Sequence, residues 1–169
     1  GTGVAITGTR IAPVTAHSIA SISQLAPGRV FLGIGTGHTA MRVMGQDPVG
    51  VKDFREYLRI VRGLIAGEEV GYTHDGKTRD IAFIHRDRYF INLDQPMPIY
   101  VAANGPLVLR ATGAYGDGWM TISVDPNEIA ASQNQIEQGA KKAGRELPHN
   151  FHKACVTSAC VLRAGDKLT

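Results

Sequence analysis

The fold is indicated most clearly by the stretch Val30-Phe31-Leu32-Gly33-Ile34-Gly35-Thr36-Gly37-His38, where a short apolar strand runs directly into a glycine-rich turn. The same arrangement returns at Pro98-Ile99-Tyr100-Val101-Ala102-Ala103-Asn104-Gly105-Pro106. Both strands are continuously apolar, which predicts that both of their faces are covered, as in a parallel sheet wrapped by helices. Each turn follows the carboxyl end of its strand, where α/β proteins bind their ligands. The repeat therefore predicts an α/β fold with a ligand-binding edge.

Strands and helices alternate along the rest of the chain. We expect strands at about 4–6, 30–34, 99–102, 119–122 and 154–162, and helices at about 13–25, 51–66, 106–115 and after Asp125. The first strand is not followed by a dinucleotide-binding glycine fingerprint, so a TIM (β/α)8 barrel is the leading architecture. Five strands cannot close such a barrel. We expect either that further strands are missing from this chain or that the barrel is reduced and rearranged.

The stretch 68–93 breaks the alternation. Asp75-Gly76 stands between two strand-like runs, which predicts a β-hairpin. We interpret 68–93 as an insertion within one domain that covers 1–169. Because the chain does not begin with Met and starts inside an apolar strand, we expect it to be a piece of a longer protein.

Composition excludes several classes of protein. The 169 residues are 43% hydrophobic and 20% charged, and the net charge of +3 is dispersed, with Arg55, Arg59 and Arg62 on what reads as a solvated helix face. No basic stripe is interleaved with aromatic residues, so we expect no nucleic-acid partner. No apolar run approaches the ~20 residues that a membrane span needs, so we expect no membrane association. No signal peptide is apparent at the first residues.

The cysteine and histidine residues predict neither a disulfide nor a metal site. Cys155 and Cys160 lie five residues apart in a strand-like run, on opposite faces and separated by about 16 Å of extended chain. We interpret them as small core residues in a reducing cytoplasm. The six histidines form no cluster with metal-ligand spacing, so no metal is expected.

Four segments together resemble the bacterial luciferase-like flavin-dependent oxidoreductases, the luciferase-like monooxygenase family. The segments span 2–10, 28–37, 98–106 and 113–119, and their order and spacing match the family over nearly the whole chain. The resemblance implies a TIM barrel with an insertion, of which this chain supplies the third through seventh strands, about five βα units. It also implies a homodimer.

The family has two cofactor branches. One uses FMN, usually delivered in reduced form by a flavin reductase, and activates O₂. The other uses the 8-hydroxy-5-deazaflavin coenzyme and transfers hydride without O₂. In the deazaflavin branch a non-prolyl cis peptide often forms a bulge behind the ring, and the matching bond here is Gly3–Val4. We expect the deazaflavin coenzyme or FMN, and favour the first.

The resemblance places the cofactor against three segments. These contain the expected cofactor-binding residues Gly3, Val4, Thr7, Gly35, Thr36, Gly37, Ala102, Ala103, Asn104 and Gly105. Glycine in such turns lets backbone N–H groups approach an anion or a flat ring closely. The alternative is that the glycines serve only a tight turn after the strand, and that the last segment is only a helix start with Pro106 in its first position.

His38 is the expected catalytic residue. In deazaflavin-dependent sugar-phosphate dehydrogenases a glutamate with an acid role follows the Gly-Thr-Gly turn, and His38 stands there in this chain. The departure argues against a sugar-phosphate substrate, although an imidazole also exchanges protons near neutral pH. The alternative is that His38 is a polar loop residue that caps the next short helix.

The function that the sequence favours is oxidoreduction of a small organic substrate, by deazaflavin hydride transfer or by reduced-FMN monooxygenation. A non-catalytic flavin-binding protein of the same family is the alternative. A TIM-barrel hydrolase or isomerase is the third possibility, but the sequence shows no nucleophile elbow, carboxylate pair or metal cluster to support it. Two further residues are given structural roles: Asp117 fixes a turn through its own backbone, and Trp119 belongs to the core.

Overall fold

The computed structural model describes residues 1–158, 161 and 163 of the chain. The strands are β1 (Ala5–Ile6), β2 (Leu32–Gly35), β3 (Val70–His74), β4 (Lys77–Ile81), β5 (Ile99–Ala102), β6 (Gly118–Thr121) and β7 (His152–Cys155). The α-helices are α1 (Ala12–Leu25), α2 (His38–Val43), α3 (Val51–Ile65), α4 (Pro106–Tyr115) and α5 (Pro126–Lys142). Two short 3-10 helices are η1 (Thr7–Thr9) and η2 (Arg86–Arg88).

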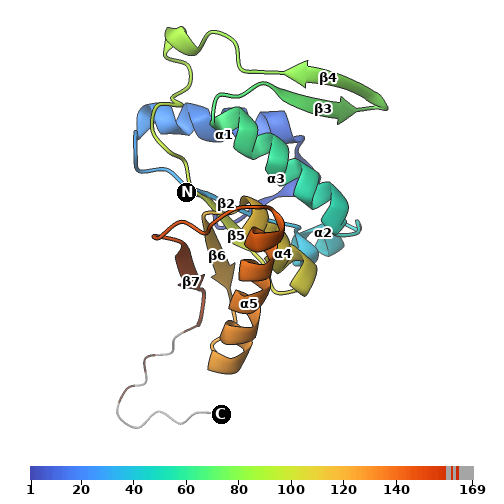
Figure 1. Ribbon diagram of the computed structural model, residues 1–169, viewed down its shortest axis with the longest axis vertical. Helices are drawn as coiled ribbons and strands as arrows, with labels where there is room; N and C mark the ends of the chain where they lie inside the picture. The colour runs from blue at the N-terminus through green and yellow to red at the C-terminus, as the bar shows by residue number, and fades with distance from the viewer. Residues whose placement is uncertain (159–160, 162, 164–169) are drawn as a thin grey trace.

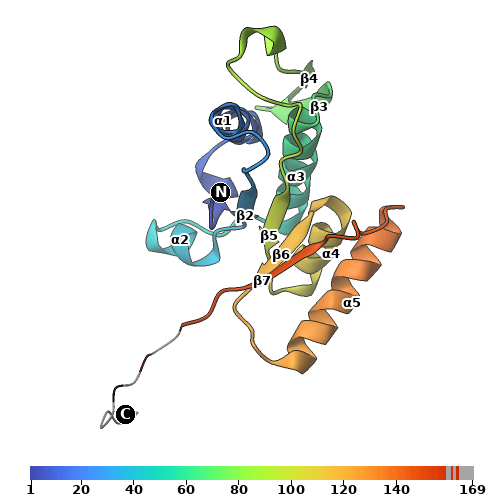
Figure 2. The same ribbon diagram turned by 90° about the vertical axis from the view of Figure 1, so that its left-hand side faces the viewer.

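Five strands form one parallel sheet in the order β1-β2-β5-β6-β7. Apart from the β3–β4 hairpin, this order is the order along the chain, so each strand pairs with the next and the sheet grows in one direction. Figure 2 shows α3, α4 and α5 along one face of the sheet, with α2 on the other side. A parallel sheet of consecutive strands covered by its own crossover helices is a segment of a barrel wall, as the sequence predicts.

The core lies between the sheet and the helices. Alternate strand residues point into it, among them Ile34, Val101 and Trp119, which are at most 1% exposed. Helix α3 contributes Phe54 and Leu58, both fully buried, from the apolar stripe that the sequence predicts. Because successive strand residues point to opposite faces, the remaining strand residues lie on the inner face of the sheet.

That inner face carries a row of aromatic side chains. The Tyr100 ring stacks on Phe31, with centroids 4.9 Å apart, and on His152, with centroids 4.8 Å apart. Phe31 immediately precedes β2, Tyr100 lies in β5 and His152 begins β7. The row therefore crosses the intervening strand β6, where Gly118 pairs with both Tyr100 and His152.

The β3–β4 hairpin stands outside the main sheet. It is a separate two-stranded antiparallel sheet at the top of Figure 1. Its turn is Asp75-Gly76, where both residues have positive φ, as a two-residue hairpin turn of this type requires. The hairpin predicted from the sequence is therefore confirmed.

The last strand differs from its prediction. Strand β7 ends at Cys155, whereas the sequence suggests a strand to Leu162, and Val156 lies beyond it, exposed. Cys155 is exposed, so its expected place in the core is wrong. The physical reason is that β7 is an edge strand of the described sheet, with a neighbour on one side only. Cys160 lies outside the described residues. Among the described helices, none has the length and apolar character to cross a bilayer.

Candidate functional site

A cavity of about 660 Å³ opens at the carboxyl ends of the parallel strands. It collects residues from β1, the β2–α2 turn, the β5–α4 turn and the end of β6. The residues expected from the sequence that line it are Gly3, Val4, Gly35, Thr36, Gly37, His38, Ala102, Ala103, Asn104 and Gly105. Three segments that lie far apart in the chain therefore meet at one place, as the parallel arrangement predicts.

The β2–α2 turn needs its last glycine for reasons internal to the fold. Gly37 has φ 77°, in the left-handed region, and a Cβ there would overlap the Ile6 side chain. The Met41 N–H donates to the Gly37 carbonyl at 2.8 Å, which starts α2. Gly37 is thus required by the turn itself, and its presence alone does not indicate a ligand.

Side chains of β6 hold the β5–α4 turn in place. The buried indole Nε1–H of Trp119 donates to the Ala103 carbonyl at 2.7 Å, and the Thr121 hydroxyl lies 3.4 Å from Asn104 Oδ1. Asn104 and Gly105 are nevertheless exposed to the cavity. Trp119 is therefore a core residue, as predicted, and it also fixes the position of the turn.

The first turn of α4 presents backbone donors beside the cavity. Within this helix the Leu109 N–H donates to the Gly105 carbonyl at 2.9 Å, and Pro106 has no N–H. The N–H groups of Leu107 and Val108 precede the first intrahelical bond, and N–H groups at a helix start favour anions. Val108 itself lines the cavity.

At two glycines of the cavity wall, Gly105 and Gly3, the protein leaves open space where a side chain would stand. A Cβ at Gly105, where φ is −84° and ψ is 148°, would meet no protein atom within 4 Å, and the same holds for Gly3. A side chain at either position would occupy the cavity instead. The wall is therefore bare in two places where a flat ring or a phosphate could contact backbone, and these residues fit a flavin-type group. The Gly3–Val4 peptide is cis, as the resemblance implies.

His38 is exposed, stands at the first position of α2 and lines the cavity. The N-cap of α2 is Gly37, and no side-chain hydrogen bond caps this helix, so the capping alternative for His38 finds no support. Among the described residues that line the cavity, His38 has the sole titratable side chain.

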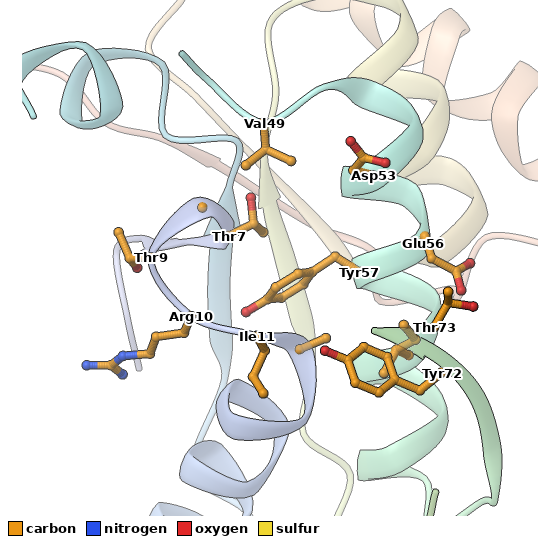
Figure 3. Close-up of a pocket in the computed structure, with 13 residues that line it drawn as sticks. Thr7, Thr9, Arg10, Ile11, Val49, Asp53, Glu56, Tyr57, Tyr72 and Thr73 are labelled. Carbon is orange, nitrogen blue, oxygen red and sulfur yellow. The ribbon is translucent and has the colours of Figure 1, made fainter. Parts of the chain in front are cut away.

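Thr7 lies apart from the other expected residues. It is buried in η1, and its hydroxyl donates to the Gly35 carbonyl at 3.3 Å, so it supports the β2 end rather than lining the cavity. Thr7 lines a second cavity of about 510 Å³ between η1, α1 and α3, drawn in Figure 3. In that cavity the Tyr57 hydroxyl lies 2.6 Å from Thr15 Oγ1, and burial raises the pKa of Tyr57.

The sequence interpretation missed several residues of the main cavity. Val108, Met120, Thr121, Ile122 and Val156 also line it. Met120 and Thr121 could have been predicted as lining residues, because they end a parallel strand, and the carboxyl ends of parallel strands meet at one edge of the sheet. Val156 carried no such signal, because it follows β7 in a stretch that the sequence suggested to be strand.

A cluster around Asp117 lies at the opposite, amino-terminal ends of the strands. The carboxylate Oδ1 accepts from Arg62 Nη2 at 2.8 Å and from Arg145 Nη2 at 2.9 Å. Its Oδ2 accepts from Arg62 Nη1 and from the Ile99 N–H, each at 3.0 Å. The sequence predicts that Asp117 fixes a turn through its own backbone. This prediction is wrong, because the partners of Asp117 come from α3, β5 and the segment after α5. Arg62, predicted to be solvated, belongs to this cluster.

The electrostatics of Asp117 follow from these partners. Burial alone would raise its pKa, but the hydrogen bonds from Arg62 and Ile99, together with the charges of Arg62 and Arg145, outweigh burial and hold the pKa below its ordinary value. Arg62 and Arg145 also donate to the Tyr115 and Gly116 carbonyls, both at 2.7 Å. Asp117 is therefore ionised and fully partnered, which suits a structural role.

The described residues contain no group of three or more His, Cys, Asp or Glu side chains placed to hold a metal ion.

Comparison with known proteins gives relatives along most of the chain. It is 37% identical over 150 residues to a 5,10-methylenetetrahydromethanopterin reductase from Methanolobus tindarius, covering 86% of this chain and 44% of that protein. It is 35% identical over 153 residues to an F420-dependent hydroxymycolic acid dehydrogenase from Mycobacterium tuberculosis, covering 86% and 41%. The chain thus spans less than half the length of these relatives.

A solved structure shares the fold. An F420-dependent secondary alcohol dehydrogenase, in complex with an F420-acetone adduct, superimposes with a TM-score of 0.72 at 25% identity, covering 89% of this chain and 47% of that one. The family model described as luciferase-like monooxygenase matches residues 1–167. The chain therefore belongs to the luciferase-like monooxygenase family.

Proposed function

We propose that this chain forms the coenzyme-binding part of an oxidoreductase that transfers hydride between the deazaflavin coenzyme F420 and a small organic substrate. The observation that carries the proposal is the bare wall of the main cavity, where Gly3 and Gly105 leave open space beside backbone donors. The relatives named as F420-dependent dehydrogenases support the choice of coenzyme. When bound, the coenzyme supplies the hydride-accepting or hydride-donating ring.

The chain's own residues divide the work of binding. Gly3 and Val4 of β1 and the turn Gly35-Thr36-Gly37 would contact the flat ring system from the side of β1 and β2. Ala102, Ala103, Asn104 and Gly105 would hold the ribityl chain and its phosphate at the start of α4. Trp119 and Thr121 would keep that turn in place through their contacts with Ala103 and Asn104.

His38 would move the proton that accompanies hydride transfer. Its imidazole stands at the cavity wall on the first residue of α2, where a ring nitrogen can donate to, or accept from, a substrate oxygen. Three further lining residues are apolar, Met120, Ile122 and Val156, so the substrate would present an apolar surface to them.

FMN is the second candidate coenzyme, since the family model that matches is described as a monooxygenase. In that case a flavin reductase would be a partner and O₂ a co-substrate. A member that binds flavin without turnover is the non-catalytic alternative.

The proposal includes three wider expectations. The residues 1–169 would form part of one TIM-barrel domain, with 68–93 as its insertion. The protein would be a homodimer, and the exposed apolar side chains of α1, among them Val14, Ile22 and Leu25, offer a contact surface. It would act in the cytoplasm, which suits the free thiol of Cys155.

The test is a calorimetric titration of the protein expressed from its complete gene with F420, FMN and reduced FMN in parallel. Binding of F420 alone supports hydride transfer, and preference for reduced FMN supports a two-component monooxygenase. Binding of none of the three would overturn the coenzyme assignment. Coenzyme binding without turnover of any alcohol, aldehyde or ketone offered would favour the non-catalytic alternative.

A further inference from the structure

A basic groove of about 690 Å³ runs along the outer surface of α4, between α3 and α5. Its floor includes Leu107, Tyr115 and Gly139. Four exposed cationic side chains line it: Lys52, Arg55, Arg110 and Lys142. The binding and structural roles described above use none of these four.

The helix packing places the four cations in order along the groove. Helices α3 and α4 run in the same direction. Arg62 near the end of α3 donates to the carbonyl of Tyr115, the last residue of α4, and the groove is also lined by Val51 and Leu107 from the starts of the two helices. The start of α3, with Lys52 and Arg55, therefore flanks the start of α4. Arg110 lies further along α4, and Lys142 closes the groove at the end of α5.

The groove begins where the coenzyme cavity ends. Gly105 and Val108 line the cavity, whereas Leu107 and Arg110 line the groove. The first turn of α4 thus separates the two, with one face toward each. A molecule whose phosphate sits at this turn could continue directly into the groove.

The charge of the groove favours a polyanion. Two carboxylates also line it, but Glu56 is already paired with Arg59 at 2.6 Å, which leaves Asp53 against the four cations. Leu107 and Tyr115 are eight residues apart on α4, a rise of about 12 Å. Cations spread over this length suit several anionic groups on one flexible chain better than one compact ion. Leu107 and Tyr115 offer apolar surface to the parts of such a chain that join its anionic groups.

We propose that the basic groove holds the acidic tail of the deazaflavin coenzyme, the chain of carboxylates that extends beyond its ribityl phosphate. The inference rests on the proposed function. FMN ends at the phosphate and has nothing to place in the groove, so the groove also discriminates between the two candidate coenzymes.

The experiment compares two ligands on three proteins, each expressed from the complete gene. The ligands are the intact coenzyme and the same coenzyme cut back to its ribityl phosphate. The proteins are the parent, the groove variant Lys52→Ala/Arg55→Ala, and the control Lys77→Ala/Arg79→Ala, which removes the same charge from exposed positions on β4. Dissociation constants are measured by calorimetry at low and high salt.

In the parent we expect the intact coenzyme to bind about tenfold more tightly than the shortened one at low salt, with most of this preference lost at high salt. The groove variant should lose about fivefold in affinity for the intact coenzyme and nothing for the shortened one, since each exposed ion pair contributes modestly. The control should match the parent.

Equal affinity of the parent for both ligands would overturn the groove proposal and leave the proposed function standing. An equal loss in the control would also overturn it, because the effect would then come from net charge. If neither ligand binds any of the proteins, the proposed function fails and the groove proposal fails with it.

Discussion

The two ends of the parallel strands are built on opposite principles. At the amino ends, Asp117 has every carboxylate oxygen partnered, by Arg62, Arg145 and the Ile99 N–H. At the carboxyl ends, Gly105 and Asn104 are exposed, and the backbone is bare at Gly3. Polar groups satisfied within the chain hold the fold, whereas those left open are available to a ligand. TIM barrels divide stability from function between the two ends of their strands in this way.

The largest expected effect is at the amino ends. Asp117→Ala removes the acceptor for two guanidinium groups and one backbone N–H, and should lower the free energy of unfolding by about 3 kcal/mol. Urea unfolding measures the loss. The exposed Asp87→Ala, in η2, is the control and should change stability by less than about 0.5 kcal/mol. A loss of coenzyme affinity in folded Asp117→Ala protein, at a temperature where it is fully native, would break the division between the two ends.

Gly37→Ala should have the next largest effect. The residue has φ 77°, and an added Cβ would overlap Ile6, so we expect a loss of about 2 kcal/mol in unfolding free energy. Thermal unfolding measures it. Because Gly37 is required by the turn, this variant tests the carboxyl end as structure rather than as a binding site, and an unchanged stability would show that the turn tolerates rearrangement.

Gly105→Ala tests the carboxyl end of the strands as a binding site. Its φ and ψ suit alanine, and its Cβ would meet no protein atom, so stability should be unchanged or slightly higher. The added methyl group would occupy the cavity, and coenzyme affinity should fall about tenfold, equivalent to about 1.4 kcal/mol. Paired measurements of unfolding and binding separate the two quantities. A stable variant with full affinity would remove Gly105 from the proposed site.

The smallest expected effect is the acid dependence of stability. The pKa of Asp117 is lower in the folded protein than its ordinary value, so its contribution is complete above the unfolded pKa of about 3.9 and is lost as pH falls through the folded pKa. The protonated carboxyl still accepts hydrogen bonds, so this loss should be smaller than that of Asp117→Ala. Urea unfolding from pH 6 to pH 3 should show a shallower decline in Asp117→Asn than in the parent; equal slopes would contradict the role of Asp117 as an ion.

Much of the fold could be predicted from local pattern. The strand at Ile99–Ala102 and the helix at Pro106–Tyr115 have the bounds that the sequence indicates, because continuous apolar runs and a proline at a helix start are local signals. The end of β7 could not be predicted, because Ala154 to Leu162 has strand composition, whereas the strand ends where its pairing with β6 ends, at Thr121 and Cys155. Pairing depends on the neighbour and not on the strand's own residues.

The residues of the two sites likewise divide into those that the sequence could predict and those that it could not. The cavity residues that follow strands β2 and β5 could be found by the rule that parallel strands end at one edge. The Asp117 cluster could not, because Arg62 and Arg145 lie 55 and 28 residues from Asp117 and meet it only through helix packing. A charged residue in a helix pattern looks solvated until its long-range partner is known.

A ligand site confined to the carboxyl ends of the strands is tested by backbone amide hydrogen exchange of the protein from its complete gene, with and without saturating F420. We expect slower exchange in the segments around Gly35–Thr39 and Asn104–Val108, and no change around Ile99 and Asp117–Trp119, which are already bonded internally. Protection confined to the Asp117 end, or none at the carboxyl-end cavity despite measured binding, would contradict this location of the site.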